Sequence, residues 1–110
     1  MFTIGLALSL RANCYDEYKN AHDDLWPEIS QSMKNNNISM IIYRIGNRLV
    51  IFGVAPSEKD WNHSRTLPIV DKWNAYMATL LETDKDGNII FEELSEAYRK
   101  NEDYNNQIRV

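Results

Sequence analysis

The chain has 110 residues, of which 44% are hydrophobic and 11% aromatic, and its formal net charge is −4. A chain of this length forms one domain with a real core, and leaves enough apolar surface uncovered that self-association is expected. The acidic balance, without any block of Lys or Arg, argues against nucleic acid and anionic membrane as partners. Residues 2–10 and 49–55 are apolar but too short to span a bilayer, and residues 2–10 lack the basic start of a signal peptide. Because the single cysteine, Cys14, cannot form an internal disulfide, we expect a cytoplasmic protein.

The first third of the chain is predicted to form a strand followed by two helices. Residues 2–10 are rich in Ile, Leu and Phe, which favours a buried strand. Asn13 offers an N-cap for a helical region over 14–35, and Pro27 ends or kinks one helix there before a second begins. One stripe of this region repeats at spacings of three and four, and it consists of Tyr15, Tyr18, His22, Leu25 and Ile29.

The middle of the chain predicts a hairpin and two further helices. Residues 39–45 and 48–54 are rich in strand formers, and Gly46-Asn47 between them tolerates the positive φ of a tight turn. Ser57 is the expected N-cap of the next helix, with the acid Asp60 three residues later. The second helix is expected over 69–81, where one side carries Val70, Trp73, Met77 and Leu80.

The last quarter is less distinctive. Residues 84–87 predict a turn, after which Ile89-Ile90-Phe91 favours a strand and 92–100 favours a helix. Residues 101–110 are polar, and we predict a mobile tail that follows a single domain over 1–100.

The order of these elements indicates the fold class. A β, α, β, β, α, β succession is the ferredoxin-like α+β arrangement, a four-stranded antiparallel sheet with helices on one face. The other face of such a sheet is bare, and Val50, Phe52 and Ile42 are candidates for it. We therefore predict a homodimer in which two sheets pack face to face.

His22 is the residue most suited to chemistry. It lies four residues after Tyr18, so both side chains project from one helical face. A buried structural histidine is one interpretation, and a general acid–base group is the other, since histidine titrates near neutral pH. His63 lies among polar residues and is expected to face solvent. The tryptophans Trp26, Trp61 and Trp73 fit either a core or the wall of a sugar pocket.

A second motif competes with this interpretation. Residues 82–93 can be written as an EF-hand loop, with carboxylates or Asn at positions 1, 3, 5 and 7, Gly87 at position 6 and Glu93 at position 12. Against it, position 1 is Glu82 rather than Asp, and EF-hands come in pairs. We predict an acidic turn and no metal site, with a calcium-responsive module as the alternative.

The segment around His22 resembles one family. Residues 22–28, HDDLWPE, are similar to the H-x-x-[IL]-W-P-E segment of L-rhamnose mutarotases, and Tyr18 precedes the histidine at the spacing of that family. The later pairs Trp61-Asn62, Lys72-Trp73 and Tyr76-Met77 also resemble the family pattern at matching intervals. Residues 93–98, ELSEAY, fall on the closing strand of the family, which favours a last strand over 94–100. The resemblance covers residues 1–100.

The resemblance implies a cofactor-independent isomerase that interconverts the α and β anomers of a monosaccharide. It implies a ferredoxin-like homodimer of the dimeric α/β-barrel type, with His22 as the catalytic residue and Tyr18, Met40, Trp73 and Asn74 as substrate-binding residues. Two positions depart from the family pattern. Asn74 stands where a second consecutive Trp is usual, and Met40 stands where a sugar-contacting Tyr is usual, with Tyr43 three residues later. Either the preferred sugar is L-rhamnose, another 6-deoxyhexose or a related aldose, or the activity is weakened.

Three other functions remain open from the sequence. A non-catalytic sugar-binding or regulatory dimer would keep the pocket and bind a sugar without accelerating anomer exchange. A calcium-responsive module would use residues 82–93. The fold also occurs in haem-handling monooxygenases, in which His22 would be an axial ligand, although fold alone is weak ground for function.

Overall fold

In the computed structural model, residues 1–100 are described, and they form the α+β fold that the sequence predicts. The predicted tail, 101–110, lies outside the described residues. The elements follow the order β1 (Phe2–Ser9), α1 (Tyr15–Asp23), α2 (Pro27–Asn35), β2 (Ser39–Ile45), β3 (Arg48–Ala55), α3 (Glu58–Ser64), α4 (Pro68–Met77) and β4 (Glu92–Glu93).

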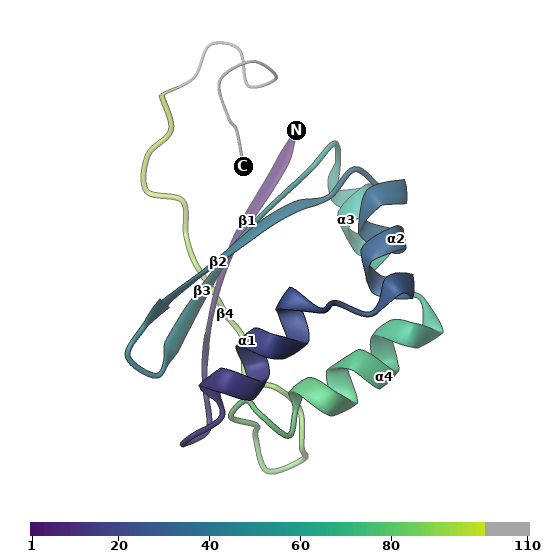
Figure 1. Cartoon of the computed structure of the whole chain (residues 1–110). Helices are drawn as coiled ribbons and strands as arrows, with labels where there is room; N and C mark the ends of the chain where they lie inside the picture. The colour runs from purple at the N-terminus through teal and green to yellow at the C-terminus, as the bar shows by residue number, and fades with distance from the viewer. Residues whose placement is uncertain (101–110) are drawn as a thin grey trace.

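The described strands form one antiparallel sheet in the order β2-β3-β1-β4. The helices cover one face of this sheet, while the chain after β4 runs along the other side (Figure 1). The predicted hairpin is confirmed: β2 and β3 pair from Ile45 opposite Arg48 to Ser39 opposite Val54. Gly46 in its turn has a φ of 58°, a left-handed conformation that glycine adopts without steric cost.

The core lies between the sheet and the helices. Because strand side chains alternate between faces, Leu49 and Ile51 of β3 point toward the helices and stand opposite Leu8 and Leu6 of β1. Leu8 and Leu49 are fully buried. The same cluster includes Tyr18, Met77, Leu80 and Leu81, so the end of α4 and the residues after it close the core.

Local signals place the helix ends, with two corrections. Pro27 occupies the first turn of α2, and the Ser57 hydroxyl accepts the backbone N–H of Asp60 at 3.1 Å, as predicted. Asn13 is not an N-cap, because its φ of 60° places it in the turn before the helix, and Cys14 takes that position. The expected helix over 69–81 begins at Pro68 and ends at Met77, since the following residues turn back to bridge Leu81 to Leu10 of the first strand.

The predicted last strand over 94–100 is wrong. β4 is limited to Glu92–Glu93, which pair with Ala7 and Leu6, and the N–H of Leu94 donates to the Gly5 carbonyl at 2.8 Å. Beyond Leu94 the chain is held by side chains, because Arg99 bonds the Thr3 hydroxyl and the Glu96 carboxylate. The segment therefore stays near the sheet without extending its ladder.

The bare face of the sheet carries two of the three residues expected on it. Val50 and Phe52 alternate with the buried Leu49 and Ile51, so they point away from the helices. Ile42 was wrongly expected there. It stands opposite Ile51 and packs against the core beneath the helices, because it has the same alternation as the core residues.

None of the helices in residues 1–100 has the length and apolar character needed to cross a membrane.

Candidate active site

A cavity of about 540 Å³ lies between the sheet and the helices. This volume is within the range of small-molecule sites. Its lining includes each residue that the family resemblance implies for catalysis or substrate binding, namely Tyr18, His22, Met40, Trp73 and Asn74. These residues come from α1, β2 and α4, so segments distant in sequence meet around one space.

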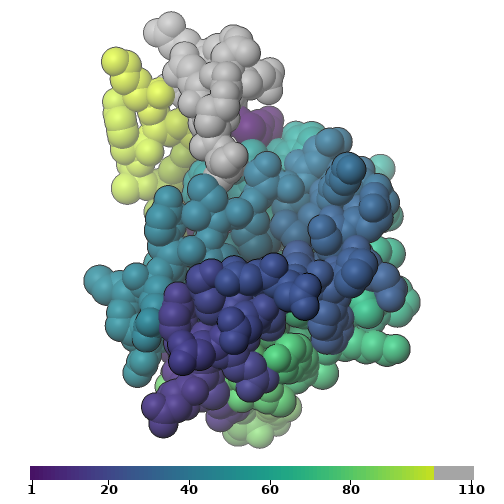
Figure 2. Space-filling view, in the orientation of Figure 1, coloured from purple at the N-terminus to yellow at the C-terminus, as the bar shows by residue number. Residues whose placement is uncertain are grey.

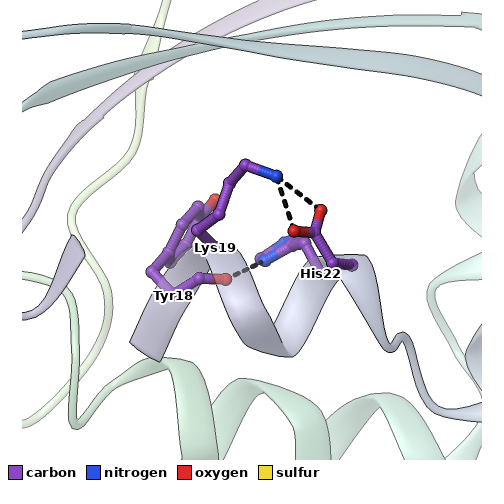
Figure 3. A network of polar contacts seen from close by, with 4 residues as sticks. Tyr18, Lys19 and His22 are labelled. Carbon is purple, nitrogen blue, oxygen red and sulfur yellow. Dashed lines mark hydrogen bonds and ion pairs between the residues drawn. The ribbon is translucent and has the colours of Figure 1, made fainter. Parts of the chain in front are cut away.

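His22 is held by its own helix. Its Nδ1 lies 2.8 Å from the carbonyl oxygen of Tyr18, one turn earlier in α1 (Figure 3). Because a carbonyl oxygen only accepts, Nδ1 carries the hydrogen and donates it. In the neutral imidazole this leaves the lone pair on Nε2, the nitrogen that can take a proton from a ligand.

The surroundings of His22 favour its neutral form. Burial lowers the pKa of His22 below its ordinary value of 6.5, against the raising effects of the Tyr18 carbonyl and the Asp23 charge. The ring packs against the Tyr18 ring at a centroid distance of 4.3 Å and meets the Trp73 ring edge-on at 5.2 Å. His22 is therefore an oriented base that remains unprotonated near neutral pH.

Tyr18 is buried beside His22. Burial raises the pKa of Tyr18 to about 12, so its phenol stays protonated. Within residues 1–100 the hydroxyl has no hydrogen-bond partner in the protein. A buried Tyr hydroxyl usually finds a partner, and a hydroxyl that lines a cavity without one is suited to a polar ligand.

Aromatic residues support one wall of the cavity. Trp73 lines the cavity, whereas Trp26 lies behind it and meets its ring edge-on at 5.2 Å. Trp26 also stacks on Tyr76 at 6.1 Å, and the Tyr76 hydroxyl donates to the Glu17 carboxylate at 2.8 Å. Of the two interpretations that the sequence left open for Trp26, the packing one holds, because its side chain lies outside the cavity lining and buttresses Trp73.

The two positions that depart from the family pattern both border the cavity. Met40 and Asn74 are half-buried in its lining. Tyr43 follows Met40 by three residues, so its side chain alternates to the other face of β2, and it is 64% exposed. Tyr43 therefore does not replace an aromatic side chain at Met40.

The structure adds charged residues that the sequence did not single out, namely Lys19, Asp23, Arg44 and Arg65. Arg44 continues the inward alternation of Met40 and Ile42, and this periodicity was the available signal for it. Its guanidinium lies 3.7 Å from the centroid of the Tyr15 ring, where α1 and the β2–β3 hairpin meet (Figure 2). Arg65 follows α3, and no local pattern indicates that it reaches the cavity.

Two other predicted features lie outside this cavity. His63 is exposed on α3, as expected, with its Nδ1 2.9 Å from the Asn36 side-chain oxygen.

In the acidic segment over 82–93, Asp84 Oδ1 accepts hydrogen bonds from the backbone N–H groups of Asp86 and Asn88 at 2.9 and 3.0 Å, and these bonds lower the pKa of Asp84. The last two residues of the 82–93 segment form the strand β4, and the structure has no helix after them within residues 1–100, whereas an EF-hand loop leads into a helix. Residues 1–100 contain no group of three His, Cys, Asp or Glu side chains placed to hold a metal ion.

Comparison with known proteins identifies similar sequences over nearly the whole described chain. The family model for L-rhamnose mutarotase matches residues 3–100. An L-rhamnose mutarotase from Shouchella clausii is 31% identical over 87 residues, which cover 76% of this chain and 84% of that protein. One from Lactiplantibacillus plantarum is 27% identical over 101 residues, covering 89% and 97% of the two chains.

The fold is also similar to a solved structure. The crystal structure of an L-rhamnose mutarotase from Formosa agariphila superimposes with a TM-score of 0.76 at 25% sequence identity. The match covers 92% of this chain and all of that one. The sequence comparison and the comparison of backbone folds therefore both find L-rhamnose mutarotases among the relatives of this chain.

Proposed function

Because this chain belongs to the L-rhamnose mutarotase family, we propose that it interconverts the α and β anomers of L-rhamnose or a related aldose, with His22 moving the protons. The observation that carries the proposal is the geometry of His22. Its Nδ1–H is committed to the Tyr18 carbonyl, which leaves Nε2 as the base beside a buried cavity. The isomerase class follows from the family, and the acid–base role of His22 is the proposed part.

Anomer exchange needs two proton movements and no net change in protons. Nε2 of neutral His22 takes the proton from the O1 hydroxyl while the C1–O5 bond breaks, and O5 receives a proton to give the open-chain aldehyde. After rotation about C1–C2, the O5 hydroxyl attacks the other face of C1, and O1 is protonated again. A single group with a pKa near neutrality can carry out both halves, and such transfer is typically worth about 10²–10⁴ in rate.

The neighbours of His22 suit this reaction. The Tyr18 hydroxyl remains a hydrogen-bond donor because burial keeps its pKa at about 12. Trp73 offers an aromatic wall, and apolar C–H faces of sugars pack well on such rings. Around one sugar ring, Tyr18 would thus supply a hydrogen-bond donor, His22 a base and Trp73 a stacking surface.

Exchange NMR on the anomeric protons tests the proposal. Wild-type protein is expected to accelerate α–β exchange of L-rhamnose, with L-fucose as a second 6-deoxyhexose. Saturation transfer that shows binding of a sugar without any accelerated exchange would favour the alternative, a non-catalytic sugar-binding or regulatory dimer of the same fold.

We also propose a cytoplasmic homodimer in which two sheets pack by their bare faces. Cys14 is a free thiol, which suits a reducing compartment. On the bare face, Tyr43 is 64% and Ile45 74% exposed, next to the half-buried Val50 and Phe52. Large exposed apolar patches mark interaction surfaces in soluble proteins, and a second copy would cover this one.

Light scattering after size exclusion is expected to give twice the mass of the chain. Val50→Asp places a carboxylate at the centre of the bare face, where dimer burial would desolvate it, so we expect a monomer. Glu58→Asp on α3 provides a control on the helical side. A wild-type monomer at micromolar concentration would contradict the proposed assembly.

The rate of anomer exchange is expected to fall as pH falls through the pKa of His22. Since burial lowers that pKa, the midpoint in kcat/KM should lie below 6.5. Asp23→Asn removes a charge that raises the pKa, so its midpoint should move to still lower pH. A midpoint above 6.5, or an unchanged midpoint in Asp23→Asn, would assign the titration to another group.

A further inference from the structure

The charges around the cavity differ from those of the chain as a whole. The chain has a net charge of −4, yet the ionisable residues that line the cavity, besides His22 and the tyrosines, are three cations and one carboxylate. The cations are Lys19, Arg44 and Arg65, and the carboxylate is Asp23. An acidic protein that gathers cations at one cavity favours the entry of an anion.

Two of these three cations are already engaged. Lys19 Nζ lies 2.6 Å from an Asp23 carboxylate oxygen one turn along α1 (Figure 3). Arg44 donates from Nε to the Gly46 carbonyl at 2.8 Å, and its guanidinium covers the Tyr15 ring. Neither is a free site for a ligand.

Arg65 is different. Its guanidinium carbon lies 5.4 Å from the centroid of the Trp61 ring, and no carboxylate or other acceptor in residues 1–100 bonds its side chain. The Arg65 side chain remains exposed to solvent where it lines the cavity, while nearby protein atoms displace part of its water and lower its pKa. A guanidinium at a cavity without a counter-ion can bind a carboxylate or phosphate through two N–H groups.

The position of Arg65 relative to His22 suggests which part of a ligand it would meet. His22 belongs to α1, and Arg65 follows α3, which lies near the other end of the helical layer (Figure 1). Both residues line the same cavity. When the anomeric carbon C1 of a sugar lies at His22, its remote end at C6 lies elsewhere in this cavity, where Arg65 is the cation without a counter-ion.

We propose that the site takes aldoses with an anionic group, a carboxylate or a phosphate, at the end remote from C1, and that Arg65 binds this group. The inference rests on the proposed function, because anomer exchange at His22 fixes which end of the sugar points away. The anionic group is a spectator in the reaction and determines specificity only.

Sugars that differ only at C6 provide the test. Exchange NMR compares D-galactose with D-galacturonate and D-glucose with D-glucose 6-phosphate, and the readout is the ratio of kcat/KM for the charged sugar to that for its neutral partner. In the wild type we expect a ratio of about 10–100, the value of one charge-assisted hydrogen-bonded contact. The pair with the larger ratio distinguishes carboxylate from phosphate.

Variants separate Arg65 from general charge effects. Arg65→Ala should bring the ratio close to one, and Arg65→Lys should restore part of it. Lys59→Ala removes a positive charge from the exposed side of α3, outside the cavity lining, and should leave the ratio unchanged. A wild-type ratio near one, or a ratio that survives Arg65→Ala, would overturn the inference.

A binding measurement distinguishes the failure of this inference from the failure of the proposed function. Tryptophan fluorescence is titrated with D-galacturonate in the wild type and in Arg65→Ala. Accelerated exchange of neutral sugars alone would keep the proposed function and dismiss the anion site. Binding that depends on Arg65 without any accelerated exchange would keep the anion site and dismiss the mutarotase reaction. The absence of both accelerated exchange and Arg65-dependent binding would dismiss both proposals.

Discussion

Replacing His22 with alanine is expected to lower the enzymatic rate of anomer exchange by about 10²–10⁴, close to the rate in buffer. The reason is that we propose Nε2 of His22 as the base, and its Nδ1–H is fixed by the Tyr18 carbonyl at 2.8 Å. The ring is half-buried against Tyr18 and Trp73, so its loss also opens space in the wall. Exchange NMR on L-rhamnose measures the effect.

His22→Gln is the sharper variant, because glutamine keeps a polar side chain of similar reach but cannot take a proton. It should lose as much rate as His22→Ala while sugar binding by saturation transfer persists. His63→Ala is the matched control, since His63 is exposed on α3 and contacts Asn36 rather than the cavity. A folded His22→Gln protein with wild-type rate would refute the acid–base role and direct attention to Asp23.

Trp61→Ala is expected to lower the free energy of unfolding by about 3–5 kcal/mol, the usual cost of deleting a buried aromatic side chain. Trp61 is 4% exposed and its ring reaches β3 at Gly53. A Cβ on Gly53 would lie 2.5 and 2.7 Å from two ring atoms of Trp61, so only glycine fits beneath the ring. Denaturant unfolding monitored by circular dichroism measures the change.

A double-mutant cycle tests this contact directly. Gly53→Ala alone should cost about 1–3 kcal/mol through overpacking. In the Trp61→Ala background the same change should cost much less, because the clashing ring is gone and the methyl group fills part of the cavity. Additive costs would show that the close approach of Trp61 to Gly53 does not set the packing of α3 on the sheet.

Most of the fold was predictable because its signals are local. Segments rich in apolar and strand-forming residues predicted β1 and the β2–β3 hairpin, and Gly46 predicted the turn. Pro27 and Ser57 marked helix starts, since each acts through its own backbone geometry or a hydrogen bond three residues away. The resemblance to L-rhamnose mutarotases added the family, which the sequence comparisons support over residues 3–100.

The pairing of His22 with Tyr18 was also visible in the sequence. A spacing of four residues places two side chains on one helical face whatever the rest of the chain does. Whether such a pair faces a core or a cavity depends on what packs above it. The cavity lined by Met40 from β2 and by Trp73 and Asn74 from α4 settles that point for this chain.

The sequence by itself determined the order of the elements, the hairpin and the shared face of Tyr18 and His22. Only the tertiary structure decided that residues 94–100 leave the sheet ladder, that Ile42 belongs to the core side, and that Arg65 reaches the cavity. The difference is one of range, because periodicity and capping act over a few residues. A strand partner, the face of a sheet and the counter-ion of a guanidinium depend instead on segments that only folding brings together.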